Sequence, residues 1–401
     1  MSIDSIDLAY EKSLDLLHNL SSEKGFLAST EDVSNYKRLW ARDSAVAILA
    51  SLVAGDKDLV FTSLHSLESL RRQQDTTGRL PSNIAFDEKN QVKKVSYGQT
   101  VGRIDATIWY IIAVCQFAIY TEDKKFFNLF QESLKKALFY LECLELNNKG
   151  LIYFPQGADW ADEYIDHGYI LLNQLLRLIA LKSYYHLTQN EKIAKDIEEL
   201  TNLILINYFP DEENLDNPYV YNKVLFTESI KEYEPPLPIS YFTTHSVHYH
   251  DSNFANALVL LTQICEPADT AAIMDCVLEK YLNQGQKIIP AFAPVITEDD
   301  PLWQKLVFHY RYEFKNKPYQ FHNGGLWPLV HGFFLAGTTK EKGKPHLQTF
   351  AEKLAKDNFI FPEYYDGQTE EAQGTKYLGF SASAYIIAYN SLIKDRRPFI
   401  L

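Results

Sequence analysis

A short segment, 157–164, places three carboxylates around a single tryptophan, Trp160. The indole offers an apolar face, and a carboxyl group in a dry site beside such a face can keep its proton near neutral pH. A protonated carboxyl group is the acid that cleavage of a glycosidic bond requires. Asp162 and Asp159 compete for this role, and Glu163 comes third. The alternative is an acidic helix entrance, because carboxylates also complement the dipole at the start of a helix.

A further candidate carboxylate, Glu363, lies in the segment Phe-Pro-Glu-Tyr-Tyr-Asp-Gly at 361–367. Hydrolysis of a glycoside needs an acid and also a second carboxylate, which acts as nucleophile or as a base on water. Glu363 is the strongest candidate for this second role, because Pro362 stiffens the backbone before it. The alternative for this segment is an ordinary surface turn.

Other polar and aromatic side chains fall at the entrances of apolar helical runs. Planar polar groups can grip sugar hydroxyls, and aromatic faces can wall a sugar ring. We therefore expect substrate binding at Arg42, Asp43, Asp105, Trp109, Asp159, Trp160, His322, Asn323 and Trp327. Asp105 could instead be a helix N-cap, and the Arg42-Asp43 pair could instead be a structural ion pair.

The composition limits the classes of partner. The chain has 401 residues, of which 46% are hydrophobic, so it can bury a large core. Its net charge of -13 argues against a nucleic acid or an anionic membrane as partner and suits a small neutral carbohydrate. A homo-oligomer is compatible with these features.

The sequence predicts neither a metal site nor a cofactor. His245, His248, His250 and Asp251 lie close together, but no second cluster with suitable spacing and no His-Glu-x-x-His motif accompanies them. The sequence 322–325, His-Asn-Gly-Gly, is too short for a phosphate-binding loop. We find no nucleophile elbow of the type Gly-x-Ser-x-Gly either.

The predicted compartment is the cytoplasm. The N-terminus lacks the basic and apolar regions of a secretory signal, and no uncharged apolar run is long enough to span a bilayer. The four cysteines lack metal or disulfide spacing and fall mostly in apolar runs, so we expect buried, reduced thiols. They are Cys115, Cys143, Cys265 and Cys276.

Apolar periodicity predicts about a dozen helices, paired by alternately short and long connections. This rhythm is typical of a ring of helical hairpins whose long loops gather at one mouth. Each candidate motif lies on a long loop before a helix expected on the inside, which favours a single site. We expect one catalytic domain, 1–401, with a long, proline-rich irregular insertion at about 208–250, serving as a lid or pocket wall.

Four motifs, taken in order, resemble those of the neutral/alkaline invertases. They are Arg42-Asp43, Gly102-Arg103-Ile104-Asp105 with Ile108-Trp109, the sequence His-Asn-Gly-Gly-Leu-Trp-Pro at 322–328, and Pro-Glu-Tyr-Tyr-Asp-Gly at 362–367. The chain is similar, more distantly, to the amylo-1,6-glucosidases, whose Thr-Trp-Met-Asp element is matched by Trp160-Ala161-Asp162 with one substitution. The resemblance implies an all-α fold, the (α/α)6 toroid.

The resemblance also implies roles for two residues. In both groups the acid is an Asp at the entrance of an inner helix, which favours Asp162 over Asp159, and Glu363 is then the base of an inverting mechanism. The invertases have Met-Ile-Asp-Arg-Arg at the acid, whereas this chain has Trp-Ala-Asp-Glu-Tyr at 160–164. The substrate pocket is therefore expected to differ from theirs.

The sequence thus predicts an inverting glycoside hydrolase for a small glycoside, sucrose-like or an α-glucosidic disaccharide. Two alternatives belong to other classes: a sugar epimerase on the same toroid and a non-catalytic sugar-binding protein. The epimerase would use histidines as acid and base, from the set His245, His248, His250 and His322. A phosphorylase would need a basic cluster near the motifs, and the sequence indicates none.

Overall fold

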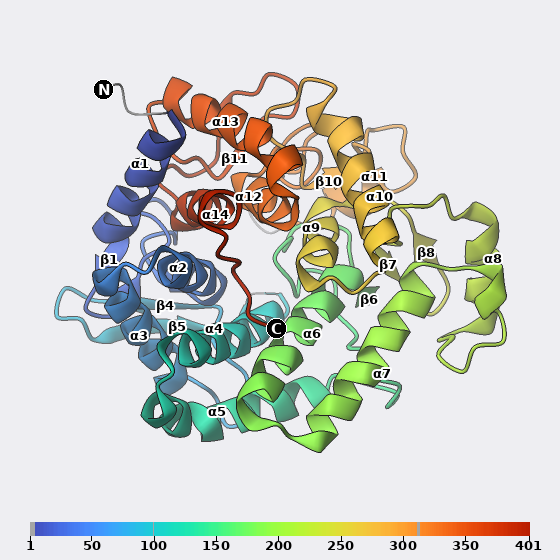
Figure 1. Ribbon diagram of the computed structural model, residues 1–401, viewed down its shortest axis with the longest axis horizontal. Helices are drawn as coiled ribbons and strands as arrows, with labels where there is room; N and C mark the ends of the chain where they lie inside the picture. The colour runs from blue at the N-terminus through green and yellow to red at the C-terminus, as the bar shows by residue number, and fades with distance from the viewer. Residues whose placement is uncertain (1–4, 99, 311–312) are drawn as a thin grey trace.

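In the computed structural model, which describes residues 5–98, 100–310 and 313–401, six helices pack side by side in a closed ring (Figure 1). They are α2 (Ala41–Ala54), α4 (Asp105–Thr121), α6 (Leu171–Thr188), α9 (Asn253–Thr262), α12 (Pro328–Gly337) and α14 (Gly379–Tyr389). Each packs against the next in this order, and α14 packs back against α2.

The inner helices are apolar on nearly every face. In α4, every residue from Asp105 to Ala118 is buried, and α9 is buried along its whole length. A helix that is apolar all round must be covered on all sides, because no face of it is suited to water. The composition of these runs therefore directs them to the interior of the ring.

A second layer of helices covers the ring. These helices are α1 (Ser5–Leu20), α3 (Lys57–Arg72), α5 (Lys124–Glu142), α7 (Glu191–Tyr208), α10 (Pro267–Val277) and α13 (Lys340–Lys356). Each packs on an inner helix and turns a polar face outward. In α5 the buried positions Phe126, Phe130, Leu134 and Leu141 recur at helical spacing, and Asp123 caps the first turn. The all-α (α/α)6 toroid is confirmed.

Short antiparallel strands fix the loops between helices. They are β1 (Ser21–Ser22), β2 (Gly25–Phe26), β3 (Leu39–Trp40), β4 (Asn83–Phe86), β5 (Val92–Ser96), β6 (Tyr169–Ile170), β7 (Tyr241–Phe242), β8 (Val247–His248), β9 (Asp251–Ser252), β10 (Phe292–Ala293), β11 (Tyr364–Tyr365) and β12 (Ala372–Gln373). They form the sheets β1-β2, β3-β4-β5, β6-β7-β8, β9-β10 and β11-β12.

Several of these sheets lie on the loops that lead into inner helices. In β3-β4-β5, Leu39 pairs with Ile84, so the start of α2 is held in place. In β11-β12, Tyr364 pairs with Gln373 directly after Glu363. Backbone pairing thus supports the segments that carry the candidate residues.

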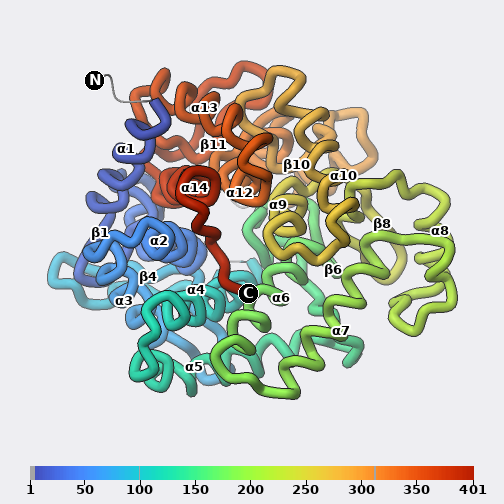
Figure 2. The backbone as a smooth tube through the Cα atoms, in the orientation of Figure 1, coloured from blue at the N-terminus to red at the C-terminus, as the bar shows by residue number. Residues whose placement is uncertain are grey.

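The segment 208–250 contains more regular structure than predicted. It includes η1 (Glu212–Asn214), α8 (Lys223–Glu232), β7 and β8. Its prolines lie before and after α8 rather than within it, so they do not interrupt that helix. Figure 2 shows α8 at the edge of the molecule, beyond α7.

The remaining elements are a short helix and two π-helical turns. They are α11 (Trp303–Val307), η2 (Leu278–Leu282) and η3 (Asn390–Lys394). After η3 the chain runs to the middle of the ring (Figure 2), where Ile400 exchanges two hydrogen bonds of 3.0 Å with Gln116 of α4. The C-terminal residues thereby cover one end of the ring.

All four cysteines are free, and the prediction of buried thiols is wrong for Cys143. Cys115 is buried in α4, Cys265 and Cys276 are half-buried, and Cys143 is exposed. Cys143 caps the C-terminal end of the outer helix α5, where the apolar stripe has ended. Among the described residues, we find no helix with both the length and the apolar character that crossing a membrane demands.

The contact between α12 and α14 tests the packing of the ring. A Cβ atom on Gly332 would overlap the backbone of Ala384 in α14. Replacement of a helical glycine by alanine normally stabilises a helix, but here the overlap must be relieved by moving one helix. We expect Gly332→Ala to lower the free energy of unfolding by about 1–3 kcal/mol in chemical denaturation. Glu198→Ala, on the exposed face of α7, is the control, and equal stability of the two variants would contradict this packing.

Candidate active site

A cavity of about 1410 Å³ opens at the N-terminal ends of the inner helices. Segments at the starts of α2, α4, α6, α12 and α14 contribute to its wall. The predicted site residues that line it are Arg42, Asp43, Trp160, Asp162, His322, Trp327 and Glu363. The ring thus brings together residues that are up to 321 positions apart, from Arg42 to Glu363.

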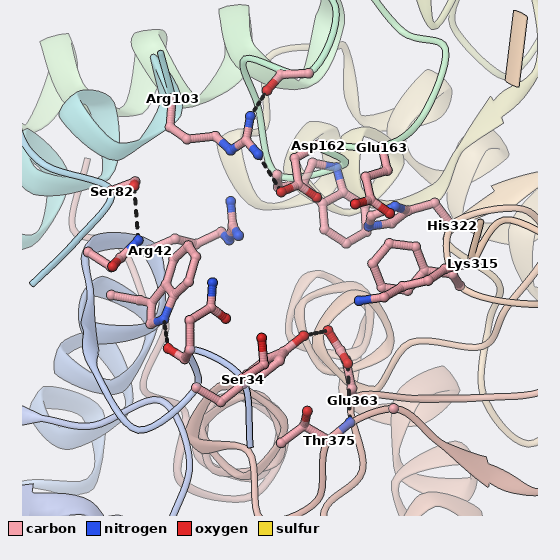
Figure 3. A pocket seen from close by; sticks show the side chains of 18 of the residues that line it. Ser34, Arg42, Ser82, Arg103, Asp162, Glu163, Lys315, His322, Glu363 and Thr375 are labelled. Atoms are coloured by element: carbon pink, nitrogen blue, oxygen red, sulfur yellow. Dashed lines mark hydrogen bonds and ion pairs between the residues drawn. The ribbon is translucent and has the colours of Figure 1, made fainter. Parts of the chain in front are cut away.

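Asp162 lies on the wall formed by the loop before α6 (Figure 3). Its side chain is 31% exposed and forms an ion pair with Arg103. Burial disfavours the charged carboxylate, but the charges of Arg103 and Arg42 outweigh this effect, so the pKa of Asp162 lies below its ordinary value. In this state Asp162 is ionised at neutral pH, which differs from the expected protonated acid.

Arg103 fixes the loop that carries Asp162. Its guanidinium group also donates to the carbonyl oxygen of Gly157, and the neighbouring Ile104 N–H donates to Ala158 at 2.8 Å. The loop before α6 is therefore attached to the start of α4 at three points. The sequence motif around Arg103 contributes Asp105 and Trp109 to the predicted site residues, but not Arg103 itself.

Glu363 lies on the wall opposite Asp162 (Figure 3). It is 6% exposed, and its two carboxylate oxygens accept hydrogen bonds from Tyr36 Oη at 2.6 Å and from the Thr375 N–H at 3.2 Å. Burial raises the pKa of Glu363, and Lys315, Tyr36 and Thr375 oppose this effect. A Cβ atom on Gly374 would overlap this carboxylate, so glycine makes room for it.

Two further carboxyl groups line the cavity with raised pKa values. Burial, with the charge of Asp162, raises the pKa of Glu163 to about 7. One oxygen of Glu163 is buried without a hydrogen-bond partner among the described residues. Burial raises the pKa of Asp43 to about 6, although Arg42 opposes it. Both groups can therefore carry a proton at mildly acidic pH.

An aromatic cluster forms another part of the wall. The His322 ring stacks on Trp327 at 4.9 Å, and Trp160 meets both rings edge-on. Burial lowers the pKa of His322 to about 3, so its ring is neutral. Within the described chain neither ring nitrogen has a hydrogen-bond partner, which leaves His322 able to bind a ligand hydroxyl.

Four predicted site residues lie behind the wall rather than on it: Asp105, Trp109, Asp159 and Asn323. Asp105 accepts a 2.7 Å hydrogen bond from Arg42 and so positions that cation. Asn323 exchanges hydrogen bonds with the backbone of Ile296. Asp105 thus supports a wall residue, whereas Asn323 is held by the backbone behind the wall.

The other two members of this set are enclosed by packing. Trp109 is fully buried against Phe254 and Phe333, because it faces the interior of the ring in α4. Asp159 accepts hydrogen bonds from Ala161 N and from Asn173 Nδ2, each at 3.1 Å. It therefore shapes the turn that presents Asp162.

Positively charged side chains, from segments far apart in the sequence, line the cavity. Lys315, on the loop before α12, lines the cavity, as do Arg103 and Arg42. The expectation that no basic cluster accompanies the motifs is therefore wrong. Arg103 could have been found from its motif, and Tyr36 from its place before Arg42-Asp43. No sequence signal marks Lys315.

The histidines at 245–250 do not line the cavity. His248 stacks on Tyr241 at 4.1 Å, and His250 lies 3.1 Å from Asp166. We detect no group of three or more potential metal ligands within residues 5–98, 100–310 and 313–401. These side chains belong to the packing around β6-β7-β8.

A family model described as alkaline and neutral invertase matches residues 16–233 and 246–395. The chain belongs to the alkaline and neutral invertase family. It is therefore a glycoside hydrolase with a carbohydrate substrate. A probable alkaline/neutral invertase D of Arabidopsis thaliana is 23% identical over 92% of this chain and 77% of its own length. Cytosolic invertase 1 of rice, Oryza sativa subsp. japonica, is 23% identical over 92% of this chain and 74% of its own length.

Solved structures of glycosidases share the fold of this invertase-family protein. A GH63 mannosylglycerate hydrolase of Thermus thermophilus, in complex with Tris and D-glycerate, matches with a TM-score of 0.64 and 13% identity. The match covers 94% of this chain and 99% of that one. A bacterial glucoamylase complexed with acarbose matches with a TM-score of 0.62 and 15% identity. This match covers 97% of this chain and 56% of the glucoamylase chain.

The burial of Asp159 predicts a pH dependence of the protein's stability. Burial, followed by the charge of Asp166, raises the pKa of Asp159 to about 8. Because the folded-state pKa is raised, the stability that this group contributes is complete at low pH and is lost as the pH rises toward 8. We expect the Tm of Asp159→Asn, relative to wild type, to increase from pH 4 to pH 9. Asp58→Asn, at an exposed position, is the control, and a pH-independent difference for Asp159→Asn would refute the buried neutral carboxyl.

Proposed function

We propose that this protein is an inverting hydrolase of a small glycoside, sucrose-like or an α-glucosidic disaccharide, with Asp162 as acid and Glu363 as base. The observation that carries this proposal is the position of the two carboxyl groups on opposite walls of one cavity (Figure 3). An inverting enzyme needs such an arrangement, because a water molecule must stand between the base and the sugar.

The surroundings of Glu363 suit a base. Tyr36 and the Thr375 N–H donate to its two oxygens and fix the plane of the carboxylate. Its buried position raises the affinity of the carboxylate for a proton. A water molecule held in the cavity could therefore transfer its proton to Glu363 as its oxygen attacks the anomeric carbon.

The acid role of Asp162 depends on Arg103. The ion pair favours the ionised form, so Asp162 takes up a proton only against the pull of Arg103. A leaving-group oxygen bound between them would weaken the pair and favour protonation of Asp162. Glu163, with its pKa raised to about 7, is the alternative proton donor on the same wall.

Sucrose and short glucosides are the first substrates to test. The curated relatives carry invertase names, and the structural neighbours include a mannosylglycerate hydrolase and a glucoamylase. The cavity exceeds the roughly 300–1,000 Å³ of typical small-molecule sites, so a disaccharide and its attacking water fit within it. Trp160 and Glu163, both on the cavity wall, are among the positions where the sequence departs from the invertase pattern.

The observations favour hydrolysis over the alternatives. An epimerase would need two titrating histidines at the sugar. His309 and His322 line the cavity, but burial lowers the pKa of both, that of His322 to about 3. A non-catalytic binding protein would not need paired carboxylates. A phosphorylase has support from Arg42, Arg103 and Lys315, so product formation with and without inorganic phosphate separates it from a hydrolase.

The cytoplasmic compartment, the single domain and the homo-oligomer remain predictions. One relative is named a cytosolic invertase, and another, of Arabidopsis thaliana, is named chloroplastic. The names of these relatives therefore place them in two different compartments.

The paired carboxylates are tested by amide substitution. We expect Asp162→Asn and Glu363→Gln each to lower kcat by roughly 100-fold or more on the best substrate of a disaccharide panel, because each removes a proton-transfer group. Circular dichroism should show that both variants remain folded. Glu371→Gln, exposed on the same loop as Glu363, is the control.

The same panel tests the stereochemistry. Anomer-resolved NMR of the first turnovers should show inversion, with the two carboxyl groups roughly 6.5–9.5 Å apart in a substrate-bound crystal structure. A retained anomer, or full activity in Glu363→Gln, would exclude the proposed mechanism. If Glu163→Gln is inactive and Asp162→Asn is active, Glu163 is the acid instead.

The Arg103–Asp162 pair predicts a pH effect. Arg103 lowers the pKa of Asp162, and an acid catalyst must be protonated, so removal of Arg103 raises this pKa. We expect the alkaline limb of the kcat/KM profile to move to higher pH in Arg103→Met. Arg71→Met, whose partner Glu68 lies away from the cavity, should leave this limb unchanged. An unmoved limb in Arg103→Met would remove Asp162 as the titrating acid.

A further inference from the structure

Lys315 lies in the cavity although no catalytic motif contains it. It belongs to the loop between α11 and α12 and lines the same cavity as Asp162 and Glu363. Its ammonium group lies 5.1 Å from the centre of the Phe321 ring and points into the open space (Figure 3). Within the described parts of the chain, no carboxylate lies within the 4.0 Å of an ion pair with it. Its charge therefore remains available to the site.

Glu363 has donors and charges around it from several elements. Tyr36, before β3, and the Thr375 N–H, after β12, donate to its oxygens. The carboxyl groups that interact with it electrostatically are Asp43 on α2 and Asp162 and Glu163 on the loop before α6. Among the neighbouring groups, Lys315 has the largest effect in lowering the pKa of Glu363. It thus opposes both burial and the surrounding negative charge.

We propose that Lys315 is a positioning residue that keeps Glu363 ionised and ready to accept a proton from the attacking water. This inference rests on the proposed hydrolysis. In that reaction the water oxygen bonds to the anomeric carbon as the glycosidic C–O bond breaks. One water proton passes to Glu363, and the leaving oxygen takes a proton from the acid. Lys315 keeps its own proton throughout and acts through its charge.

The chain offers a matched control. Lys317 lies two residues away on the same loop and lines the same cavity, but its effect on the pKa of Glu363 is smaller than that of Lys315. Both lysines are exposed, so neither substitution removes a buried contact. Lys315→Met removes the charge, Lys315→Arg keeps it, and Lys317→Met removes an equal charge from the neighbouring position.

The kinetic experiment measures kcat/KM against pH with the panel disaccharide that wild type hydrolyses fastest. The base must be ionised, so removal of Lys315 raises the pKa of Glu363 and moves the acid limb to higher pH. In Lys315→Met we expect the rate in the acid limb to fall by roughly threefold or more, with the alkaline limb in place. Lys315→Arg should return the acid limb to its wild-type pH. Lys317→Met should leave the acid limb at that pH, whatever its effect on the overall rate. An unmoved acid limb, or an equal loss at every pH, would overturn the proposal.

A second experiment needs no turnover. Because the pKa of Glu363 is raised in the folded state, its contribution to stability is complete at low pH and is lost as the pH rises. Without Lys315 this loss should be larger, so the Tm of Lys315→Met should fall relative to wild type between pH 4 and pH 8. The difference should vanish in the Glu363→Gln background. A difference that persists there would refute the coupling, whereas full activity of Glu363→Gln would refute the catalytic role of Glu363 itself.

Discussion

Closure of the inner ring is the constraint on which the site depends. The last inner helix, α14, packs against the first, α2, although the two lie at opposite ends of the chain. This contact brings Tyr36, just before α2, to within 2.6 Å of Glu363, on the loop between α13 and α14. Without it the two catalytic candidates would have no common cavity. A residue as small as Gly332 is required between α12 and α14 because these helices pack too closely for a larger side chain.

The same geometry concentrates charge at one end of the toroid. Several inner helices begin at the cavity, and the positive ends of their dipoles favour carboxylates there. Burial of several carboxyl groups raises the pKa values of Asp43, Glu163 and Glu363, while Arg103 lowers that of Asp162. Neighbouring carboxyl groups in one cavity therefore titrate differently. In the free protein the lowered pKa belongs to the proposed acid, Asp162, so a bound leaving group must weaken its pair with Arg103 before Asp162 can donate a proton.

The departures from the sequence expectations have local physical causes. The prolines of 208–250 indicated irregular structure, yet they flank α8 and do not enter it. Trp109 belongs to the motif at 102–109, but its place in the buried part of α4 directs it to the core. Asp105 and Asn323 carry polar groups typical of a binding site, but Asp105 pairs with Arg42, and Asn323 pairs with the backbone of Ile296.

The sequence by itself determined the layers and the candidate loops. Apolar composition and periodicity are local properties, so the inner helices, the outer helices and the motif-bearing loops before them could be predicted from short windows of residues. The tertiary structure alone decided which side chains share the cavity. Tyr36 donates a hydrogen bond to Glu363 across 327 positions of the chain, and the charge of Lys315 acts on Glu363 across 48. Only the packing of distant helices brings such groups together. The electrostatic state of each carboxyl group follows from those contacts, because a pKa depends on burial and on neighbours brought together by the fold.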